Sequence, residues 1–213
     1  MKFTTKLLSL AIASSAAIAP TAFAQSADLS ITGRIFPGAC TIELGNGGIA
    51  DLGDIRADTL NEARVTIMPP VTLPMTVSCE SEVRYAFQGT DNTSGSSTGS
   101  NGYGLGLTPA DEKIGHALIM IPEATADSGM GYGTNSSDDG ATWTTSNGSG
   151  SNHVTSSRLT GFAKSEGTNA GPDAIKQLQA TLSVLAVIEP KENLTIDGDV
   201  PINGSATLNL FYL

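Results

Sequence analysis

The chain has little positive charge, few aromatic residues and only two cysteines. Lys and Arg number 11 against 21 Asp and Glu among its 213 residues, so the formal net charge at pH 7 is −10. Negative charge repels nucleic-acid phosphates and anionic lipid head groups, and both classes of partner are therefore disfavoured. We expect no nucleic acid among its partners, and we expect the acidic surface to serve solubility.

Long apolar runs are also scarce, and the one that is present stands at the start. Residues 1–24 contain Lys2 and Lys6, an apolar stretch over 7–19, and the small-x-small pattern Ala-Phe-Ala at 22–24. This arrangement is typical of a secretory signal peptide, and the stretch is too short for a membrane span. We therefore expect an exported chain of 189 residues (213 − 24), whose net charge is −12 once the two lysines are removed (9 basic, 21 acidic).

Both cysteines, Cys40 and Cys79, lie in the exported part of the chain. In an oxidising compartment a disulfide between them is the default expectation. Closing a loop with 38 intervening residues stabilises the fold by about 4 kcal/mol in the chain-entropy model. A metal site is disfavoured because the sequence has no CxxC and neither histidine is near a cysteine. The length suits one domain over 25–213.

Apolar residues almost nowhere recur at helical spacing, whereas alternating runs broken by Gly, Pro and Asn are frequent. These runs predict strands over 28–36, 40–44, 71–79, 83–87, 113–121, 178–188 and 206–213. Short helical turns are the alternative at 61–65 and 173–178. Two stretches rich in Gly, Ser, Thr and Asn, 90–104 and 127–152, predict long polar loops or a ragged hairpin. Many short strands with regular turns indicate an all-β protein, and a β-sandwich in particular.

The segment SSDDGATW, residues 136–143, resembles the Asp-box of sialidase-like propellers. Asp138 can accept bonds from turn amides, Gly140 can adopt a positive φ, and Trp143 can fold back as a packing anchor. A propeller needs several copies and this chain has one. We therefore predict a Trp-anchored hairpin and no glycosidase.

Other candidates for chemistry are weak. His116 and His153 are 37 residues apart, and no serine stands in a G-x-S-x-G context, so a catalytic triad is disfavoured. Asp127, Asp138 and Asp139 could bind calcium, but they lack the ligand spacing of an EF-hand. We predict that the protein is not an enzyme and needs no cofactor or metal.

The chain as a whole resembles the chaperone-usher fimbrial subunits. The residues that carry the resemblance are GRIFPGACT at 33–41, Cys79, and the alternating segment ATLNLFYL at 206–213, with Tyr212 second from the end. GRIFPGACTIELGNGG at 33–48 and YGLGLTPADEKIG at 103–115 are further similar to the beta-type subunits. The resemblance implies an immunoglobulin-like, pilin-type β-sandwich that lacks its final strand and is completed by donor-strand complementation.

The resemblance also implies partners and site residues. A periplasmic chaperone, and later a neighbouring fimbrial subunit, would add a strand beside the terminal one, and an outer-membrane usher would export the subunit to the cell surface. One wall of the receiving groove would be formed by Ala206, Leu208, Leu210 and Tyr212, and the carboxylate of Leu213 would meet basic residues of the chaperone. The donor segment would include Leu29 and Ile31, and the disulfide would hold the first two strands together.

Three functions remain open at this point. The first is a structural subunit of a fimbria that contributes to cell adhesion. The second is a single-domain adhesin or tip subunit, in which the polar loops and Trp143 contact a host or surface glycan. The third is a self-contained secreted β-sandwich that binds a ligand or hydrolyses a substrate.

Overall fold

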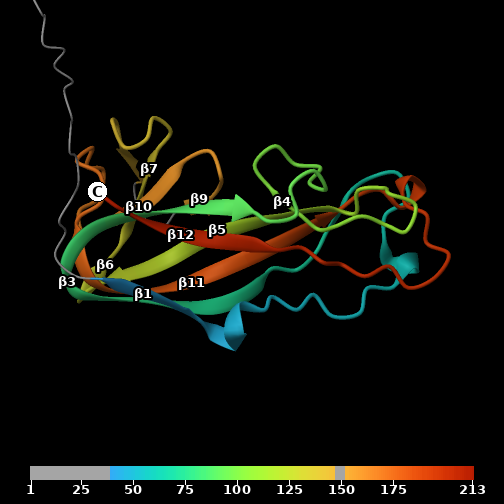
Figure 1. Cartoon of the computed structure of the whole chain (residues 1–213), viewed down its shortest axis with the longest axis horizontal. Helices are drawn as coiled ribbons and strands as arrows, with labels where there is room; N and C mark the ends of the chain where they lie inside the picture. Colours follow the sequence, from blue (N-terminus) through green and yellow to red (C-terminus); the bar gives the residue numbers. More distant parts are fainter. Residues whose placement is uncertain (1–38, 147–151) are drawn as a thin grey trace, which may run out of the picture. The chain divides into compact units, whose positions relative to one another are not determined.

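A computed structural model describes residues 39–146 and 152–213 (Figure 1). The chain divides into two compact units, 1–35 and 36–213, and every described residue belongs to the second. The expected signal peptide and the expected donor residues Leu29 and Ile31 lie outside the described residues.

The described part is all-β, as predicted, and contains no α-helix. Its strands are β1 Cys40–Leu44, β2 Thr66–Ile67, β3 Val71–Asp91, β4 Tyr103–Gly104, β5 Gly115–Ala126, β6 Gly129–Met130, β7 Tyr132–Ser136, β8 Thr144–Thr145, β9 Asn152–Val154, β10 Leu159–Ala163, β11 Ala174–Ile188 and β12 Ala206–Tyr212. Three short 3-10 turns connect them: η1 Gly45–Gly48, η2 Ala57–Thr59 and η3 Lys191–Asn193.

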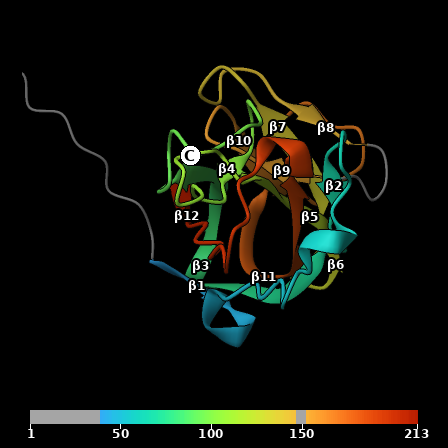
Figure 2. The ribbon, with the colours of Figure 1, turned by 90° about the vertical axis from the view of Figure 1, so that its right-hand side faces the viewer.

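All strands pair antiparallel, in a curled sheet with the order β4-β5-β11-β3-β10-β7-β8. The remaining strands attach to this path: β1 and β12 to β3, β2 to β11, and β6 and β9 to β5. Figure 2 shows the strands curling around a common interior.

The long strand β3 organises the sheet. Its first part pairs with β1 on one edge and β11 on the other, and its last part pairs with β12 and β10. The sequence predicts two strands here, 71–79 and 83–87, but the structure has one strand of 21 residues. Odd-numbered positions face inward throughout, from Leu73 to Gly89, because the alternation keeps its phase through Glu80-Ser81-Glu82.

The prediction of short helical turns at 61–65 and 173–178 is wrong. Residues 61–65 contain no helix, and 173–178 lie mostly in β11, which begins at Ala174. Ile175 and Leu178 are buried and pair with Val83 and Val77 of β3, with a register shift between Ile175 and Gln177. Sheet pairing and burial outweigh the local preference of this segment.

The polar segment 127–152 contributes more to the sheet than its composition indicates. It contains β6, β7 and β8 and the start of β9, and Thr134, Ser136 and Thr145 are buried. The other polar stretch, 90–104, is mostly turns between the end of β3 and β4. Polar side chains reach the interior here because backbone pairing of β7 with β10 and β8 places them there.

Two apolar clusters fill the interior. The larger includes the fully buried Met75, Phe87 and Phe162, and Phe87 makes edge-to-face contacts with Tyr85 and Phe162, at ring-centroid distances of 5.6 and 6.5 Å. The smaller is built around Leu105, Ile114 and Ile188. Each fully buried side chain of this size stabilises the fold by roughly 1.5–3 kcal/mol relative to exposure.

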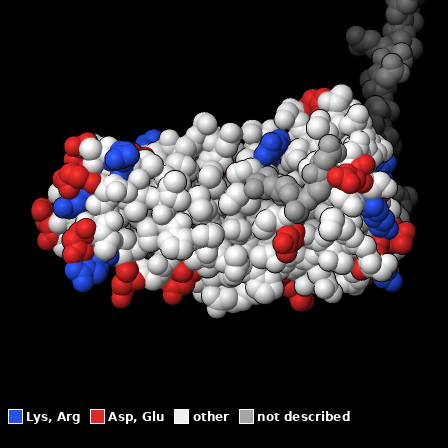
Figure 3. All heavy atoms as spheres, turned by 180° about the vertical axis from the view of Figure 1, so that it is seen from behind, with Lys and Arg blue, Asp and Glu red and all other residues white. Residues whose placement is uncertain are grey.

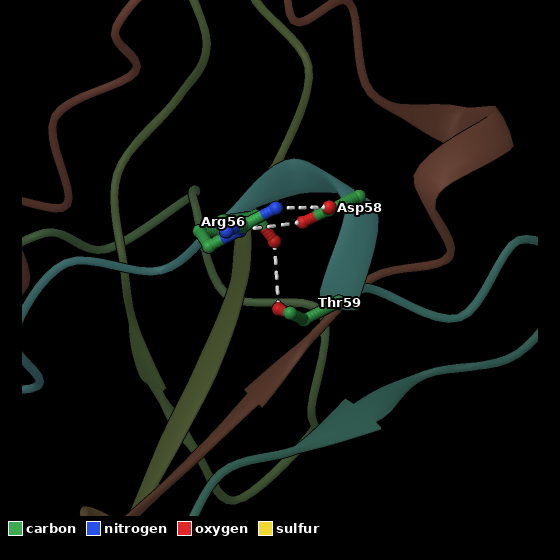
Figure 4. Close-up of polar contacts among 3 residues, drawn as sticks. All are labelled: Arg56, Asp58 and Thr59. Carbon is green, nitrogen blue, oxygen red and sulfur yellow. Dashed lines mark hydrogen bonds and ion pairs between the residues drawn. The ribbon is translucent and has the colours of Figure 1, made fainter.

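The connection from β1 to β3 crosses the surface and includes the turn η2. Arg56 and Asp58 form an ion pair there, and the Thr59 hydroxyl donates to the Arg56 carbonyl at 2.6 Å (Figure 4). The two charged side chains are 77% and 63% exposed. Exposed pairs of this kind contribute little to stability, so η2 is a surface turn.

Candidate functional site

The terminal strand β12 lies along the last part of β3 (Figure 1). Its register runs from Ala206 opposite Asp91 to Tyr212 opposite Tyr85. The Leu213 amide continues the ladder and donates to the Arg84 carbonyl at 3.0 Å. The prediction of a strand at this end of the sequence is confirmed.

The inward face of β12 is only partly covered. Leu208, Leu210 and Tyr212 pack against the larger apolar cluster, yet all three remain half-buried. Ala206 is exposed, and Leu213 is 40% exposed. Three of the four residues expected in the groove wall therefore share one apolar face that packs against the core, while Ala206, like Leu213 beyond the wall, is exposed.

Strands β12 and β1 follow one another along the same edge of β3. β12 covers Asp91 to Tyr85, and β1 covers Cys79 to Met75. The Tyr212 hydroxyl accepts a hydrogen bond from the Cys40 amide at 2.8 Å, where the two strands meet. The disulfide between Cys40 and Cys79, which the sequence predicts, is present at the same place.

The second edge of β12 has no strand partner within residues 39–146 and 152–213. A strand edge presents backbone N–H and C=O groups that can pair with another chain. Side chains of β12 form hydrogen bonds on the β3 side of the strand. Asn209 donates to the Thr90 hydroxyl at 2.8 Å, and Asn92, directly after β3, donates to the Thr207 hydroxyl at 3.0 Å.

The predicted Trp-anchored hairpin is confirmed between β7 and β8. Asp138 accepts bonds from the Ser136 hydroxyl at 2.7 Å and from the amide and hydroxyl of Thr142 at 2.9 and 2.6 Å. These bonds, those from Thr142 above all, lower the pKa of Asp138 to about 2. Gly140 has a φ of 90°, and the Trp143 indole donates to its carbonyl at 3.0 Å.

A polar depression adjoins this hairpin. Its volume is about 470 Å³, and it is lined by residues of β7, β8 and the connection between them, together with Ser146 and Arg158. The sequence pointed to neither Thr145 nor Arg158, because nothing in their local pattern distinguishes them from ordinary loop residues.

The two histidines do not meet. His116, in β5, contacts the Thr98 hydroxyl through Nδ1 at 3.0 Å, and His153 lies in β9. Burial lowers the pKa of both imidazoles, and Arg158 adds to this effect at His153. Across the part of the chain that the structure describes, no group of three or more His, Cys, Asp or Glu side chains could hold a metal ion.

Charged side chains are few over the middle of the face drawn in Figure 3 and gather toward its margins. Among the residues with described positions, no helix is long and apolar enough to cross a membrane.

Residues 29–142 match the model of a protein family of unknown function, DUF1120. The chain belongs to this family. The DUF1120 match takes in β1 to β7, both cysteines and most of the hairpin connection, and it ends before Arg158 and β12. Neither a curated protein nor a solved structure matches the chain.

Proposed function

We propose that this protein is a structural subunit of a chaperone-usher surface fimbria, exported through the periplasm and assembled by donor-strand exchange. The observation that carries the proposal is the state of β12: it is paired along β3 only, within the described residues, and its inward Leu208, Leu210 and Tyr212 are half-buried. In this proposal the curled sheet is an immunoglobulin-like, pilin-type sandwich that lacks its final strand.

A strand added along β12 would supply what this edge lacks. Main-chain hydrogen bonds would provide affinity, and side chains of the incoming strand would cover the apolar face. Complete burial of a leucine stabilises by about 2 kcal/mol relative to exposure. Since Leu208, Leu210 and Tyr212 are already half-buried, an added strand would gain the part of this energy that their exposed surface represents. Without a partner the same edge would promote aggregation.

The proposed partners act in sequence. A periplasmic chaperone binds the edge first, with its basic residues at the Leu213 carboxylate. A neighbouring subunit replaces it at the outer-membrane usher, and Leu29 and Ile31 belong to the segment that this chain offers in turn. Adhesion would follow from the fibre as a whole.

Photo-crosslinking tests the position of the incoming strand. A photo-reactive amino acid replaces Phe211 in β12 or, as the matched control, Met130 in β6; these apolar side chains are 42% and 58% exposed. We expect the variant at 211, and not the variant at 130, to crosslink a periplasmic chaperone co-expressed with it. Equal crosslinking at both positions, or none at 211, would contradict the proposal.

A second experiment asks whether the fold is incomplete by itself. Expressed without the chaperone, the chain should aggregate, and a donor-strand peptide appended after Leu213 should restore a soluble, protease-resistant monomer. A stable monomer in the absence of both chaperone and appended strand would support the self-contained secreted protein instead.

A further inference from the structure

The depression beside the β7–β8 hairpin is lined by two residues, Thr145 and Arg158, that each have a buried polar atom without a hydrogen-bond partner. All of its lining residues are polar, and among them Thr145 is 7% exposed. The Thr145 Oγ1 atom is shielded from solvent and makes no hydrogen bond. A polar group that is buried without a partner loses its hydrogen bonds to water and gains none in return, so the Thr145 hydroxyl destabilises the unliganded fold.

Arg158 also has hydrogen-bond donors without partners, and it carries a full positive charge. Its Nε is shielded and has no hydrogen-bond partner, and its Nη2 makes one long bond, 3.5 Å, to the His153 carbonyl. No carboxylate in 39–146 or 152–213 lies within ion-pair distance of it. A guanidinium offers five donors in a planar fork that matches a carboxylate, and most of these donors are unused here.

The other charged group of the depression needs no counter-charge of its own. Asp138 is ionised, and its oxygens already accept three hydrogen bonds from Ser136 and Thr142. The unmatched charge is therefore positive, and it indicates a ligand with one negative group.

The rest of the lining selects against a simple phosphate. Arg158 is the one cation among the lining residues, it shares the depression with Asp138, and the whole chain carries a net charge of −10. A phosphate dianion would be poorly neutralised here. Hydroxyls and an amide, on Ser137, Thr144 and Asn135, supply the donors and acceptors that sugar hydroxyls need.

We propose that this depression binds an acidic sugar, with its carboxylate on Arg158 and its ring hydroxyls on the surrounding Ser, Thr and Asn side chains. The volume of about 470 Å³ lies within the range of small-ligand sites. The site consists of residues of one chain and needs no added strand, so it stands or falls independently of fimbrial assembly.

Calorimetric titration of the exported chain, purified with any chaperone that accompanies it, tests the ligand class. Glucuronate and galacturonate are compared with glucose, galactose and inorganic sulfate. We expect the uronates to bind at least tenfold more tightly than the neutral hexoses and than sulfate. Equal binding of uronate and hexose would overturn the role of Arg158, and sulfate binding as tight as uronate binding would overturn the sugar.

Variants test the two unpartnered groups. Arg158→Gln should weaken uronate binding at least tenfold, whereas Arg56→Gln, at the exposed arginine of η2, should leave it unchanged. Thr145→Val should raise the melting temperature of the unliganded chain, because it removes an unpaired buried hydroxyl, and should leave uronate binding within twofold, because the shielded Oγ1 atom cannot reach a ligand in the depression. Uronate binding that is unchanged in Arg158→Gln would refute the proposal.

Discussion

At the scale of single residues, Trp143 is held by two glycines. Its indole nitrogen donates to the carbonyl of Gly140, and Gly171, with a φ of 80°, lies against the indole ring. A Cβ added at Gly171 would come within 2.8 Å of the ring. Trp143 is also the single tryptophan of the chain, so its fluorescence reports on this site directly.

Replacing Gly171 by alanine should lower the free energy of unfolding by more than the cost of placing an alanine at a positive φ. The positive φ costs about 1–2 kcal/mol for any L-residue, and crowding the indole adds roughly 1–3 kcal/mol. Gly47→Ala is the matched control, since its φ is 61° and nothing lies within 4 Å of the added Cβ. Denaturant unfolding followed by Trp143 fluorescence measures both, and equal losses would disprove the contact.

At the scale of elements, the disulfide joins β1 to β3 at the point where β12 ends. Cys40 and Cys79 are directly opposite in the ladder, and the Tyr212 hydroxyl accepts from the Cys40 amide. The bond therefore holds β1 on the edge of β3 beside the proposed strand-addition site. It also closes a loop with a sequence separation of 39.

Removing the disulfide through Cys40→Ala with Cys79→Ala should lower the free energy of unfolding by about 4 kcal/mol, chiefly through the entropy of the unfolded chain. Reduction of the unsubstituted protein should have a similar effect, and reductant should leave the double variant unchanged. Urea denaturation with and without reductant gives the comparison. A loss below about 1 kcal/mol would show that strand pairing alone holds β1.

Patterns within one strand were predictable from the sequence, and pairings between strands were not. The alternation at 206–213 predicts β12, and turn chemistry predicts the hairpin around Asp138. The unbroken course of β3 was missed because Glu80-Ser81-Glu82 interrupts the run of apolar residues, although both glutamates stand at outward positions of a continuous alternation. The strand start at Ala174 was missed because the residues that pair with Ala174 and Ile175, Arg84 and Val83, are distant in sequence.

At the scale of the whole molecule, folding partly buries two histidines, His116 and His153, that the unfolded chain exposes. The loop 98–102 covers His116, whose ring contacts Thr98, and His153 lies beside Arg158. Burial lowers the pKa of both imidazoles, and Glu189 opposes this effect at His116. The unfolded chain therefore binds more protons than the folded chain once the pH drops toward 6.5, the ordinary value for histidine.

The free energy of unfolding should therefore be unaffected by these two histidines above pH 6.5. It should decrease as the pH drops from 6.5 toward their lowered pKa values in the folded state. The melting temperature should decrease measurably between pH 7.5 and pH 5.5, a window above the titration of carboxylates such as Asp138, whose pKa is about 2. His116→Gln with His153→Gln should flatten the profile. A profile that stays equally steep in this double variant would assign the dependence to other groups.

The sequence by itself determined that this protein is all-β, that its two cysteines pair, and that a strand and a Trp-anchored hairpin stand where they do, because alternation and turn chemistry act over a few residues. Only the tertiary structure decided that β12 lies on the edge of β3 with its apolar face partly covered. It also decided that Arg158 shares a depression with Thr145, 13 positions earlier in the chain. Strand register and buried polar contacts depend on which distant segments meet, and no local pattern encodes that choice.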